Sequence, residues 1–468
     1  MIKIDKLEAI SPIDGRYRRT TEPLSEFFSE KALIKYRVLV ECEYLMFLSE
    51  HPKLGLRKLT DDEKSLLKSL CNLTMEDAAI VKAIEVKGYK QLKPTNHDVK
   101  AVEYFLKDKL GETSLKDALE WVHFGLTSED ANNLAYSLML SNGLKAVVMP
   151  AIDAVYAKMD ELANKYKSIP MLARTHGQPA SPTTFGKEFR VFASRLGRQI
   201  SQLKNQEILV KMNSATGNYN AQYAAYPDVD WPEFTTQFIE HLNAYAGLKL
   251  KANLITTQIE PHDSYAELFD IVRRANTILL GFNQDMWRYI SDGWLKQKPV
   301  EGEVGSSTMP HKVNPIDFEN SEGNLGIANA LLAYFSSKLP ISRLQRDLSD
   351  STVLRNLGTA FAHCLIAYNS ALRGMSKIDV NEAKVIAELE NHPEVISEAI
   401  QTILRKEGIA APYELMKDLT RGKKVELADF YLFIDNLNVS GEVKTRLRQI
   451  TPLNYTGLAE ALAGMKND

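Results

Sequence analysis

The chain has 468 residues, with 57 Lys and Arg against 60 Asp and Glu and a net charge of −3. This balance excludes a global electrostatic drive toward nucleic acid or a membrane surface, so any anion site must be local. A chain of this length can bury a large core and suggests about three domains of roughly 150 residues each. We predict domains over residues 1–115, 116–365 and 366–468.

Three cysteines lie far apart in the sequence, at Cys42, Cys71 and Cys364. The first residues, Met1–Asp5, lack the apolar segment of a secretory signal. No run of 18 apolar residues appears, so we expect no membrane span. These features favour a reducing, cytoplasmic location.

The first polar cluster is Asn96, His97 and Asp98, which precedes a helical run. This cluster can be explained simply as a helix cap. A neighbouring His and Asp can also suggest a metal, but no third ligand stands at a familiar spacing. We therefore predict no metal site here.

The second cluster begins at His123, whose neighbours Val122 and Phe124 are apolar, as is typical of a satisfied core histidine. Thr127 and Ser128 stand before two acidic residues and so predict a helix start. Because the N-terminus of a helix attracts anions, the same residues are candidates for substrate binding.

The middle of the chain carries the strongest helical signal. Apolar residues in 144–167 recur at steps of 4, 3, 4, 3 and 4, which marks one helical stripe. Similar stripes cover 185–203, 268–286 and 318–335, and these segments exceed the mean helix length of roughly 11–12 residues. Since strands do not alternate with helices, we predict an all-α fold with a central bundle of long helices. Their periodicity favours self-association, and the alternative is that each stripe packs only within its own chain.

Two stretches, 213–231 and 294–316, interrupt the helical periodicity and are expected to be functional loops. A short motif, Arg174–Pro179, also separates two helical stripes. Its residues can serve as a simple helix cap. Alternatively, His176 titrates near neutrality and can donate a proton to a departing amine.

The segment Gly305–Pro315 combines three hydroxyls, an imidazole, an ammonium and an amide with two prolines. Glycine and proline disfavour a helix here, and polar loops of this kind often carry chemistry. From the residues alone we predict an anion-binding loop with a hydroxyl acid or base.

The last cluster lies between Arg343 and Arg355. Asp350, Ser351 and Thr352 are N-cap residue types at the start of a helix expected to run to Ala371. Two arginines, hydroxyls and free backbone N–H groups make a phosphate or carboxylate site. A solvated charged turn is the alternative.

Taken together, these motifs resemble the adenylosuccinate lyase family, bacterial-type branch, within the fumarase/aspartase superfamily. The resemblance covers about residues 9–456 in family order. Fumarases and aspartases usually carry glycine where His311 stands and lack the Arg346 and Arg355 cluster. The motifs that carry the resemblance are Ser11–Tyr17, Thr95–Lys100, Thr127–Asp130, Arg174–Pro179, Thr256–His262 and Gly305–Pro315.

The resemblance implies a homotetramer in which each active site is assembled from three subunits. It also implies elimination of fumarate from adenylosuccinate, giving AMP, and from the succinylaminoimidazole carboxamide ribonucleotide, giving AICAR. No cofactor is implied, because the elimination transfers no electrons to an acceptor.

The resemblance further implies roles for individual residues. His176 is similar to the general acid of the family and Ser306 to its general base, with Lys312 and Asn314 stabilising the carbanion and His97 supporting the acid or the phosphate. Arg16, Tyr17, Arg346, Ser351 and Arg355 would hold the phosphate. Further substrate-binding candidates are Asn96, Asp98, Thr127, Ser128, Gln258, Ser307, Asn320 and Thr352.

Two alternatives stay open at this point. One is another fumarate-releasing lyase of the superfamily, of the fumarase or argininosuccinate type. The other is a non-catalytic structural relative, since fold does not fix function.

Overall fold

The computed structural model describes residues 5–298, 309, 312–422 and 424–465. The chain divides into two compact units. The first contains residues up to Ile152, Gln199–Thr277 and Gly323–Tyr368, and the second contains Asp153–Arg198, Ile278–Glu322 and the residues from Asn369 onward. The three-domain division predicted from the sequence stays a prediction.

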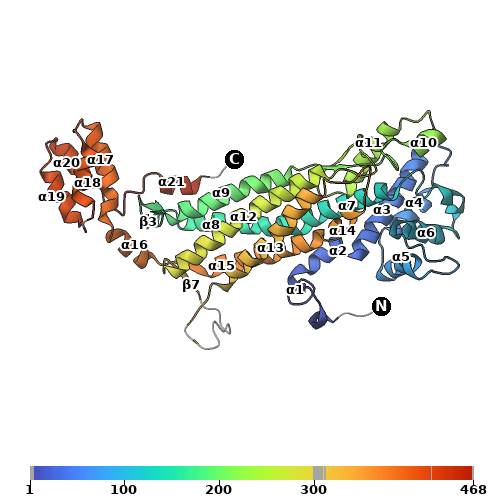
Figure 1. Cartoon of the computed structure of the whole chain (residues 1–468), viewed down its shortest axis with the longest axis horizontal. Helices are drawn as coiled ribbons and strands as arrows, with labels where there is room; N and C mark the ends of the chain where they lie inside the picture. The colour runs from blue at the N-terminus through green and yellow to red at the C-terminus, as the bar shows by residue number, and fades with distance from the viewer. Residues whose placement is uncertain (1–4, 299–308, 310–311, 423, 466–468) are drawn as a thin grey trace. The chain divides into compact units, whose positions relative to one another are not determined.

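The fold is all-α, as the sequence predicted, and the long helices of Figure 1 follow the apolar stripes. In α8, for example, Ile152, Val155 and Met159 are all at most 2% exposed. The helices that contribute residues to both units are α8 (Met149–Lys165), α9 (Phe185–Lys204), α12 (Asp263–Ser291), α13 (Ile316–Lys338) and α15 (Leu357–Lys377).

Shorter elements complete the first unit. The strands β5 and β6 pair in parallel. The elements of this unit are η1 (Lys6–Glu8), α1 (Arg18–Thr21), η2 (Glu22–Leu24), α2 (Ser25–Phe28), α3 (Glu30–Glu50), α4 (Asp61–Leu70), α5 (Met75–Val86), α6 (Asp98–Leu110), η3 (Ser114–Trp121), α7 (Ser128–Gly143), η4 (Leu144–Val148), β5 (Ile208–Val210), α10 (Asn220–Ala225), α11 (Trp231–Leu242), η5 (Asn243–Tyr245), β6 (Leu250–Ala252) and α14 (Ser349–Leu354).

The second unit holds two antiparallel strand pairs on one hairpin, β1 with β4 and β2 with β3, and a third antiparallel pair, β7 with β8. Its elements are β1 (Pro170–Met171), β2 (Arg174–Thr175), β3 (Gln178–Pro179), β4 (Thr183–Thr184), β7 (Leu295–Gln297), β8 (Ile378–Val380), α16 (Glu382–Glu390), η6 (Pro393–Ile396), α17 (Ser397–Lys406), α18 (Pro412–Thr420), α19 (Leu427–Asp435), α20 (Gly441–Arg448) and α21 (Ala459–Gly464).

The helix predicted to begin near residue 144 in fact begins at Ser128, because α7, the π-helical turn η4 and α8 follow one another without a break. Pro150 lacks a backbone N–H, and the π-helical turn lies immediately before it. This segment, Ser128–Lys165, is long and apolar enough to cross a membrane, but 56% of its most apolar window is buried within the protein. Core helices of soluble proteins share these properties.

The sequence predicted a single helix from Asp350 to Ala371, and this prediction is wrong. It is divided into α14 and α15 at Arg355 and Asn356. The Asn356 side chain donates to the Thr352 carbonyl at 2.9 Å, so it satisfies an end group of α14. The stretch 213–231 also differs from the prediction, because it contains the short helix α10.

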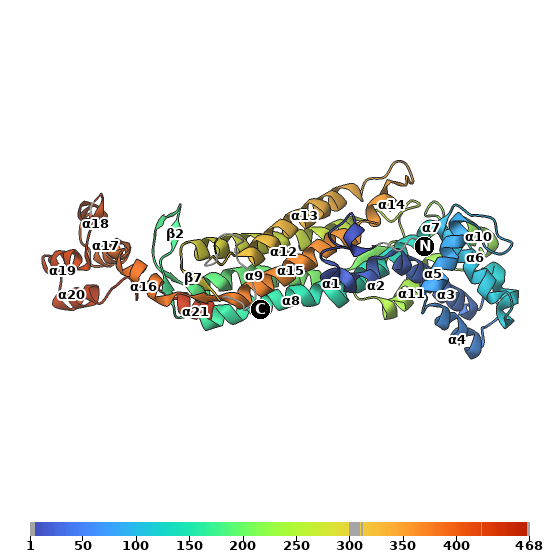
Figure 2. The same ribbon diagram turned by 90° about the horizontal axis from the view of Figure 1, so that it is seen from below.

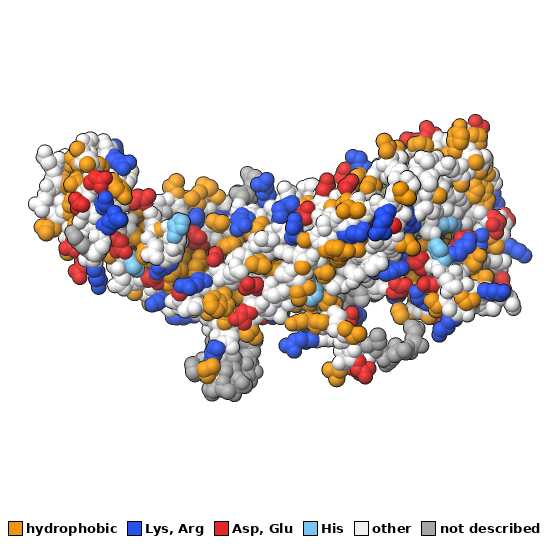
Figure 3. Space-filling model, viewed as in Figure 1, with side chains coloured by type: hydrophobic (Ala, Val, Ile, Leu, Met, Phe, Trp, Pro, Cys, Tyr) orange, Lys and Arg blue, Asp and Glu red, His pale blue; other side chains and the backbone are white. Residues whose placement is uncertain are grey.

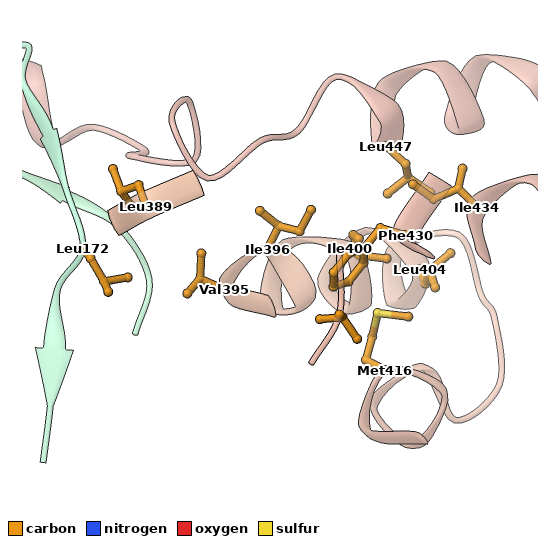
Figure 4. Packing of buried hydrophobic residues seen from close by; sticks show 11 residues of the cluster. Leu172, Leu389, Val395, Ile396, Ile400, Leu404, Met416, Phe430, Ile434 and Leu447 are labelled. Carbon is orange, nitrogen blue, oxygen red and sulfur yellow. The ribbon is translucent and has the colours of Figure 1, made fainter. Parts of the chain in front are cut away.

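The C-terminal part of the second unit has a core of its own, in which Leu172 joins residues of α16–α20 (Figure 4). Leu389 of α16 and Ile400 of α17 are completely buried there. Leu172 lies between β1 and β2, so this core holds the base of the hairpin that carries His176. The buried members are Leu172, Leu389, Val395, Ile396, Ile400, Leu404, Met416, Val425, Phe430, Ile434 and Leu447.

Candidate functional site

His97 is both the N-cap of α6 and a candidate substrate contact. Its Nδ1 accepts the Lys100 backbone N–H at 3.2 Å, and its Nε2 lies 3.3 Å from the Ser128 hydroxyl. Because Nδ1 is an acceptor, Nε2 carries the proton of the neutral ring. The side chain is 50% exposed, so this N–H can also reach a ligand. The capping interpretation is therefore confirmed, and the role of His97 in substrate binding stays a prediction.

Asp98 joins two arginines from elements far apart in the sequence. Its Oδ2 accepts from Arg37 of α3 at 2.8 Å and from Arg355, which follows α14, at 2.9 Å. Burial favours the neutral carboxyl, but the Arg37 guanidinium outweighs it and lowers the pKa of Asp98. The Glu30 carboxylate also acts on Arg355, so the cluster carries no simple excess of positive charge, but the partly exposed Arg355 guanidinium can still pair with an anionic ligand.

Arg355 also borders a cavity of 320 Å³ in the first unit. Ser11 and Asp14 of the N-terminal motif also line this cavity, as does Arg18, which directly follows the motif. Arg16 and Tyr17 belong to this motif but are not among the lining residues, and the Arg16 guanidinium lies 5.9 Å from the Tyr17 ring centre. The structure thus brings Arg355 to the N-terminal motif.

Arg346 anchors a second polar group in the same unit. It donates to the Gln258 side-chain oxygen at 3.1 Å and forms an ion pair with Glu129 at 3.1 Å. Glu129 is 2% exposed, and burial raises its pKa to about 7 despite the positive charge of Arg346. Gln258 donates in turn to the Ala215 carbonyl at 2.9 Å, so its side chain is fixed.

A buried ion pair aligns the segments that carry these groups. Lys211 and Asp130 are 2.7 Å apart and fully buried. The Asp130 carboxylate accepts the backbone N–H of Thr127 at 2.8 Å, and Lys211 donates to the Gln258 carbonyl at 2.9 Å. The pair therefore holds the start of α7, with Thr127 and Ser128, against the Gln258 segment.

His176 occupies the tip of a β-hairpin rather than a helix cap, so the capping interpretation of Arg174–Pro179 is wrong. Arg174 pairs with Pro179, Thr175 pairs with Gln178, and His176 and Gly177 form the turn, as can be followed in Figure 2. Both turn residues have positive φ, 52° and 75°, as a type I′ turn requires. His123 and His262 also have positive φ, so this conformation fits the turn but does not by itself indicate a function.

The other candidates of the second unit lie around the start of α13. Asn320 accepts from the Ser370 hydroxyl at 2.7 Å, and Ser370 accepts from Arg373 at 2.7 Å. Lys312 is exposed, and Asn314 is half-buried. Ser306, Ser307 and His311 lie outside the described residues.

The candidates thus fall into two groups. His176, Lys312, Asn314 and Asn320 belong to the second unit. The first unit contains Arg16, Tyr17, Asn96, His97, Asp98, Thr127, Ser128, Gln258, Arg346, Ser351, Thr352 and Arg355. Within the first unit the structure joins His97 to Ser128, Asp98 to Arg355, and Gln258 to Arg346. The Ser351 carbonyl accepts the Arg355 backbone N–H at 3.3 Å, which is a contact within one turn of the backbone. Thr352 is exposed.

Sequence reasoning missed Arg37 and Tyr136. Arg37 is 2% exposed within α3, where it also donates to Asn132 at 2.9 Å. The signal was present, because a charged residue in an apolar helical run needs a buried partner. Tyr136, whose hydroxyl lies 3.4 Å from Arg355, stands in an apolar stretch without such a signal.

His123 is not part of this group. Its Nδ1 lies 2.6 Å from the buried Glu41 carboxylate, in agreement with a satisfied, mostly buried histidine. Among the described residues, no three His, Cys, Asp or Glu side chains stand close enough together to hold a metal ion.

The geometry supports binding of an anion at the Arg355 cluster and proton donation from exposed imidazoles. A partly exposed guanidinium beside a cavity suits a phosphate or carboxylate.

Comparisons with known proteins agree with these motifs along almost the whole chain. The family described as Lyase matches residues 15–329, and the one described as Adenylosuccinate lyase C-terminal matches residues 342–456. The chain is 49% identical over 461 residues to adenylosuccinate lyase of Escherichia coli K12, covering 98% of each chain. It is 49% identical over 468 residues to adenylosuccinate lyase of Dictyostelium discoideum, again covering 98% of each.

Solved structures share the fold at much lower identity. A fumarate lyase from Mesorhizobium sp. BNC1 matches with a TM-score of 0.71 and 18% identity, covering 94% of this chain and 96% of its own. The 3-carboxy-cis,cis-muconate lactonizing enzyme of Pseudomonas putida matches with a TM-score of 0.69 and 19% identity, covering 94% and 95%. These likenesses concern the fold alone. The family resemblance of the sequence is confirmed by the full-length relatives, and the chain belongs to the adenylosuccinate lyase family.

Proposed function

We propose that this protein is an adenylosuccinate lyase, which eliminates fumarate from adenylosuccinate to give AMP. The succinylaminoimidazole carboxamide ribonucleotide is cleaved at the same site to give AICAR. The observation that carries this proposal is the identity of about half of all residues over 98% of the chain to adenylosuccinate lyases.

The elimination needs three kinds of group. A base removes a proton from the carbon beside a carboxylate, donors stabilise the resulting negative charge, and an acid protonates the departing nitrogen. We assign the acid to His176 and the base to Ser306, and we assign charge stabilisation to Lys312 and Asn314. A serine hydroxyl is a weak base in water, so its alkoxide requires a dry, cationic site.

The nucleotide phosphate is assigned to the Arg355 cluster. The partly exposed Arg355 guanidinium and the adjoining cavity support this assignment. We assign the remaining contacts to two groups of residues. Arg16, Tyr17, His97, Arg346 and Ser351 assist at the phosphate, while Asn96, Asp98, Thr127, Ser128, Gln258, Ser307, Asn320 and Thr352 contact or position the rest of the substrate.

The assembly is proposed to be a homotetramer with shared active sites. The support comes from α13, which is apolar on two faces. Leu325, Ala328 and Leu332 are fully buried, whereas Ile327 and Tyr334, seven residues apart, are 50% and 53% exposed. The exposed face of 323–337 carries no charged residue: it consists of Gly323, Gly326, Ile327, Ala330, Tyr334 and Ser337. A helix that is apolar on an exposed face is typical of an interface.

A cytoplasmic location without nucleic-acid or membrane partners completes the proposal. Acidic and basic side chains are interspersed on the face shown in Figure 3, without a large region of one sign. The cysteines at 42, 71 and 364 are all free thiols, as in a reducing compartment.

A panel of substrates tests the reaction. The purified protein is mixed separately with adenylosuccinate, the succinylaminoimidazole carboxamide ribonucleotide, argininosuccinate and malate, and fumarate is followed by its ultraviolet absorbance. Release from the first two alone supports the proposal. Release from argininosuccinate or malate alone would assign a different lyase activity, and release from none would assign a non-catalytic relative.

A further inference from the structure

The hairpin that carries His176 is fixed by a residue of α16 that no sequence motif had marked. The Glu388 carboxylate accepts a hydrogen bond from the Arg174 guanidinium at one oxygen and from the Trp294 indole N–H at the other. Because both oxygens are engaged, the carboxylate cannot rotate without breaking one of these bonds.

Arg174 transmits this constraint to the turn. Its guanidinium donates to the Gly177 carbonyl at 3.3 Å and lies 5.7 Å from the centre of the Trp294 ring. The Arg174 side chain thus connects the first residue of β2 to Gly177, the last residue of the turn. His176 lies between these two points, in the left-handed backbone region.

The surroundings make Glu388 a firm anchor. Its neighbour Leu389 is fully buried in the same core as Leu172, which precedes Arg174 by two residues (Figure 4). Trp294 is 5% exposed, and its carbonyl accepts the Asn381 N–H at 2.8 Å, which ties the strand region to the start of α16. The Glu388 and Arg174 side chains are 17% and 31% exposed, so water screens their ion pair only in part.

We propose that Glu388 is a positioning residue for the proton-donating His176: it holds Arg174, and Arg174 holds the turn. The catalytic part of this inference rests on the proposed function, whereas the ordering of the hairpin does not. Groups that orient a catalytic side chain affect the rate more than the affinity, since a misplacement of about 1 Å can cost roughly 100-fold.

The test uses Glu388→Gln in the full-length protein, with Glu390→Gln as the matched control. Glu390 is exposed on the same helix, so the control removes the same charge without touching the hairpin. Hydrogen exchange of the peptide over 170–184 is measured first. Its amide at Ala180 donates to the Ala173 carbonyl at 2.9 Å. Loss of a charge-assisted bond should speed exchange in Glu388→Gln by about tenfold or more, and the control should exchange like the wild type.

Kinetics supply the second readout. We expect Glu388→Gln to lower kcat by about 10- to 100-fold with KM changed less than about threefold. In a His176→Ala background the same change should cost nothing more, because its effect passes through His176. Trp294→Phe removes the indole donor together with part of a buried ring, and it should act in the same direction if Glu388→Gln folds poorly.

Two results would overturn the proposal. One is wild-type exchange of the 170–184 peptide in both Glu388→Gln and Trp294→Phe. The other is an equal loss of rate with and without His176, which would mean a general effect on the fold. A wild-type protein that releases no fumarate would refute the proposed function, and the exchange measurement would still decide the role of Glu388 in the hairpin.

Discussion

Arg355 combines a structural contact with an exposed, charged surface. It donates to Asp98 in the first unit, yet its side chain stays 41% exposed and borders the 320 Å³ cavity. Since Asp98 is also held by Arg37, the carboxylate keeps a partner when Arg355 is replaced. The fold should therefore tolerate a substitution that removes the anion contact.

We predict that Arg355→Ala raises KM for adenylosuccinate by about 10- to 100-fold, which corresponds to roughly 1.5–3 kcal/mol for one charge-assisted bond. The phosphate is remote from the bond that breaks, so kcat should change little. Steady-state kinetics decide the outcome. Arg343→Ala, at a side chain that is 84% exposed, is the control and should behave as the wild type. Unchanged KM in Arg355→Ala would refute the phosphate assignment.

Glu260 provides a residue-scale prediction about pH. It is 1% exposed and accepts from Asn253 at 3.0 Å and from the His262 backbone at 2.6 Å, and no cationic partner of Glu260 stands among the described residues. Burial raises the pKa of Glu260 to about 7 from an ordinary value of 4.5. Its contribution to stability is thus fully present below about pH 4.5 and is lost as the pH rises through about 7.

Glu260→Gln cannot ionise and should lack this part of the pH dependence. In urea unfolding at fixed protein concentration, the free energy of unfolding of the variant should rise relative to that of the wild type between about pH 5 and 8. The relative rise should be on the order of 2–3 kcal/mol. Any change in the free energy of unfolding that does not depend on pH cancels when the shapes of the two pH curves are compared. Parallel curves for the two proteins would mean that Glu260 titrates normally.

At the scale of elements, the start of α9 packs directly on the end of α8 and the residues after it. A Cβ on Gly186 would lie 2.3 Å from the Ala163 carbonyl oxygen and 2.4 Å from the Lys167 Cα. These are backbone atoms, so the helices themselves would have to separate. Gly281 in α12 is the opposite case, because its Cβ would meet only Phe192 at 3.8 Å.

Gly186→Ala should therefore destabilise the fold by about 1–3 kcal/mol through overpacking. Gly281→Ala, the matched control, should be neutral or stabilise by up to about 1 kcal/mol through helix propensity. Thermal or urea unfolding of both variants measures the difference. Equal stability of the two would show that the α8–α9 junction can adjust.

The long helices were predictable because their apolar stripes repeat over many turns, as in α12 and α13. The His176 hairpin was not, because its strands are two residues long and no period can develop in them. The break between α14 and α15 was missed for a related reason. Asn356 ends α14 by a local side-chain bond, and such bonds leave no trace in a periodic pattern.

Prediction of the site depended on motifs rather than periodicity. His97, Asp98 and Arg355 were found because polar residues clustered in short segments. Their contacts with Arg37 and Tyr136 were not foreseen, since α3 and α7 contribute single polar side chains to apolar runs. Glu388 lay outside every motif, and its role depends on a fold in which α16 meets the hairpin.

At the scale of the whole molecule, the proposed tetramer predicts complementation between inactive variants. His176→Ala and Ser306→Ala proteins are unfolded together and refolded. Some mixed sites should then draw both intact residues from different chains, so part of the activity should return. Sedimentation of the wild type should also give about four chains.

Each variant refolded alone is the control and should stay inactive. Mixing is verified with a mass-tagged chain, because hybrids that never formed would prove nothing. Hybrids that stay inactive after verified mixing, or a fully active monomer, would mean that one chain builds its own site.

The central claim is that this chain releases fumarate from adenylosuccinate with His176 as the acid. It is tested most directly by quantifying AMP and fumarate formed from adenylosuccinate by the wild type and by folded His176→Ala. We predict equal amounts of the two products from the wild type. In the variant, kcat should fall by about 10²–10⁴-fold or more while substrate binding is retained. No product from the wild type, or near-wild-type turnover by His176→Ala, would contradict the claim.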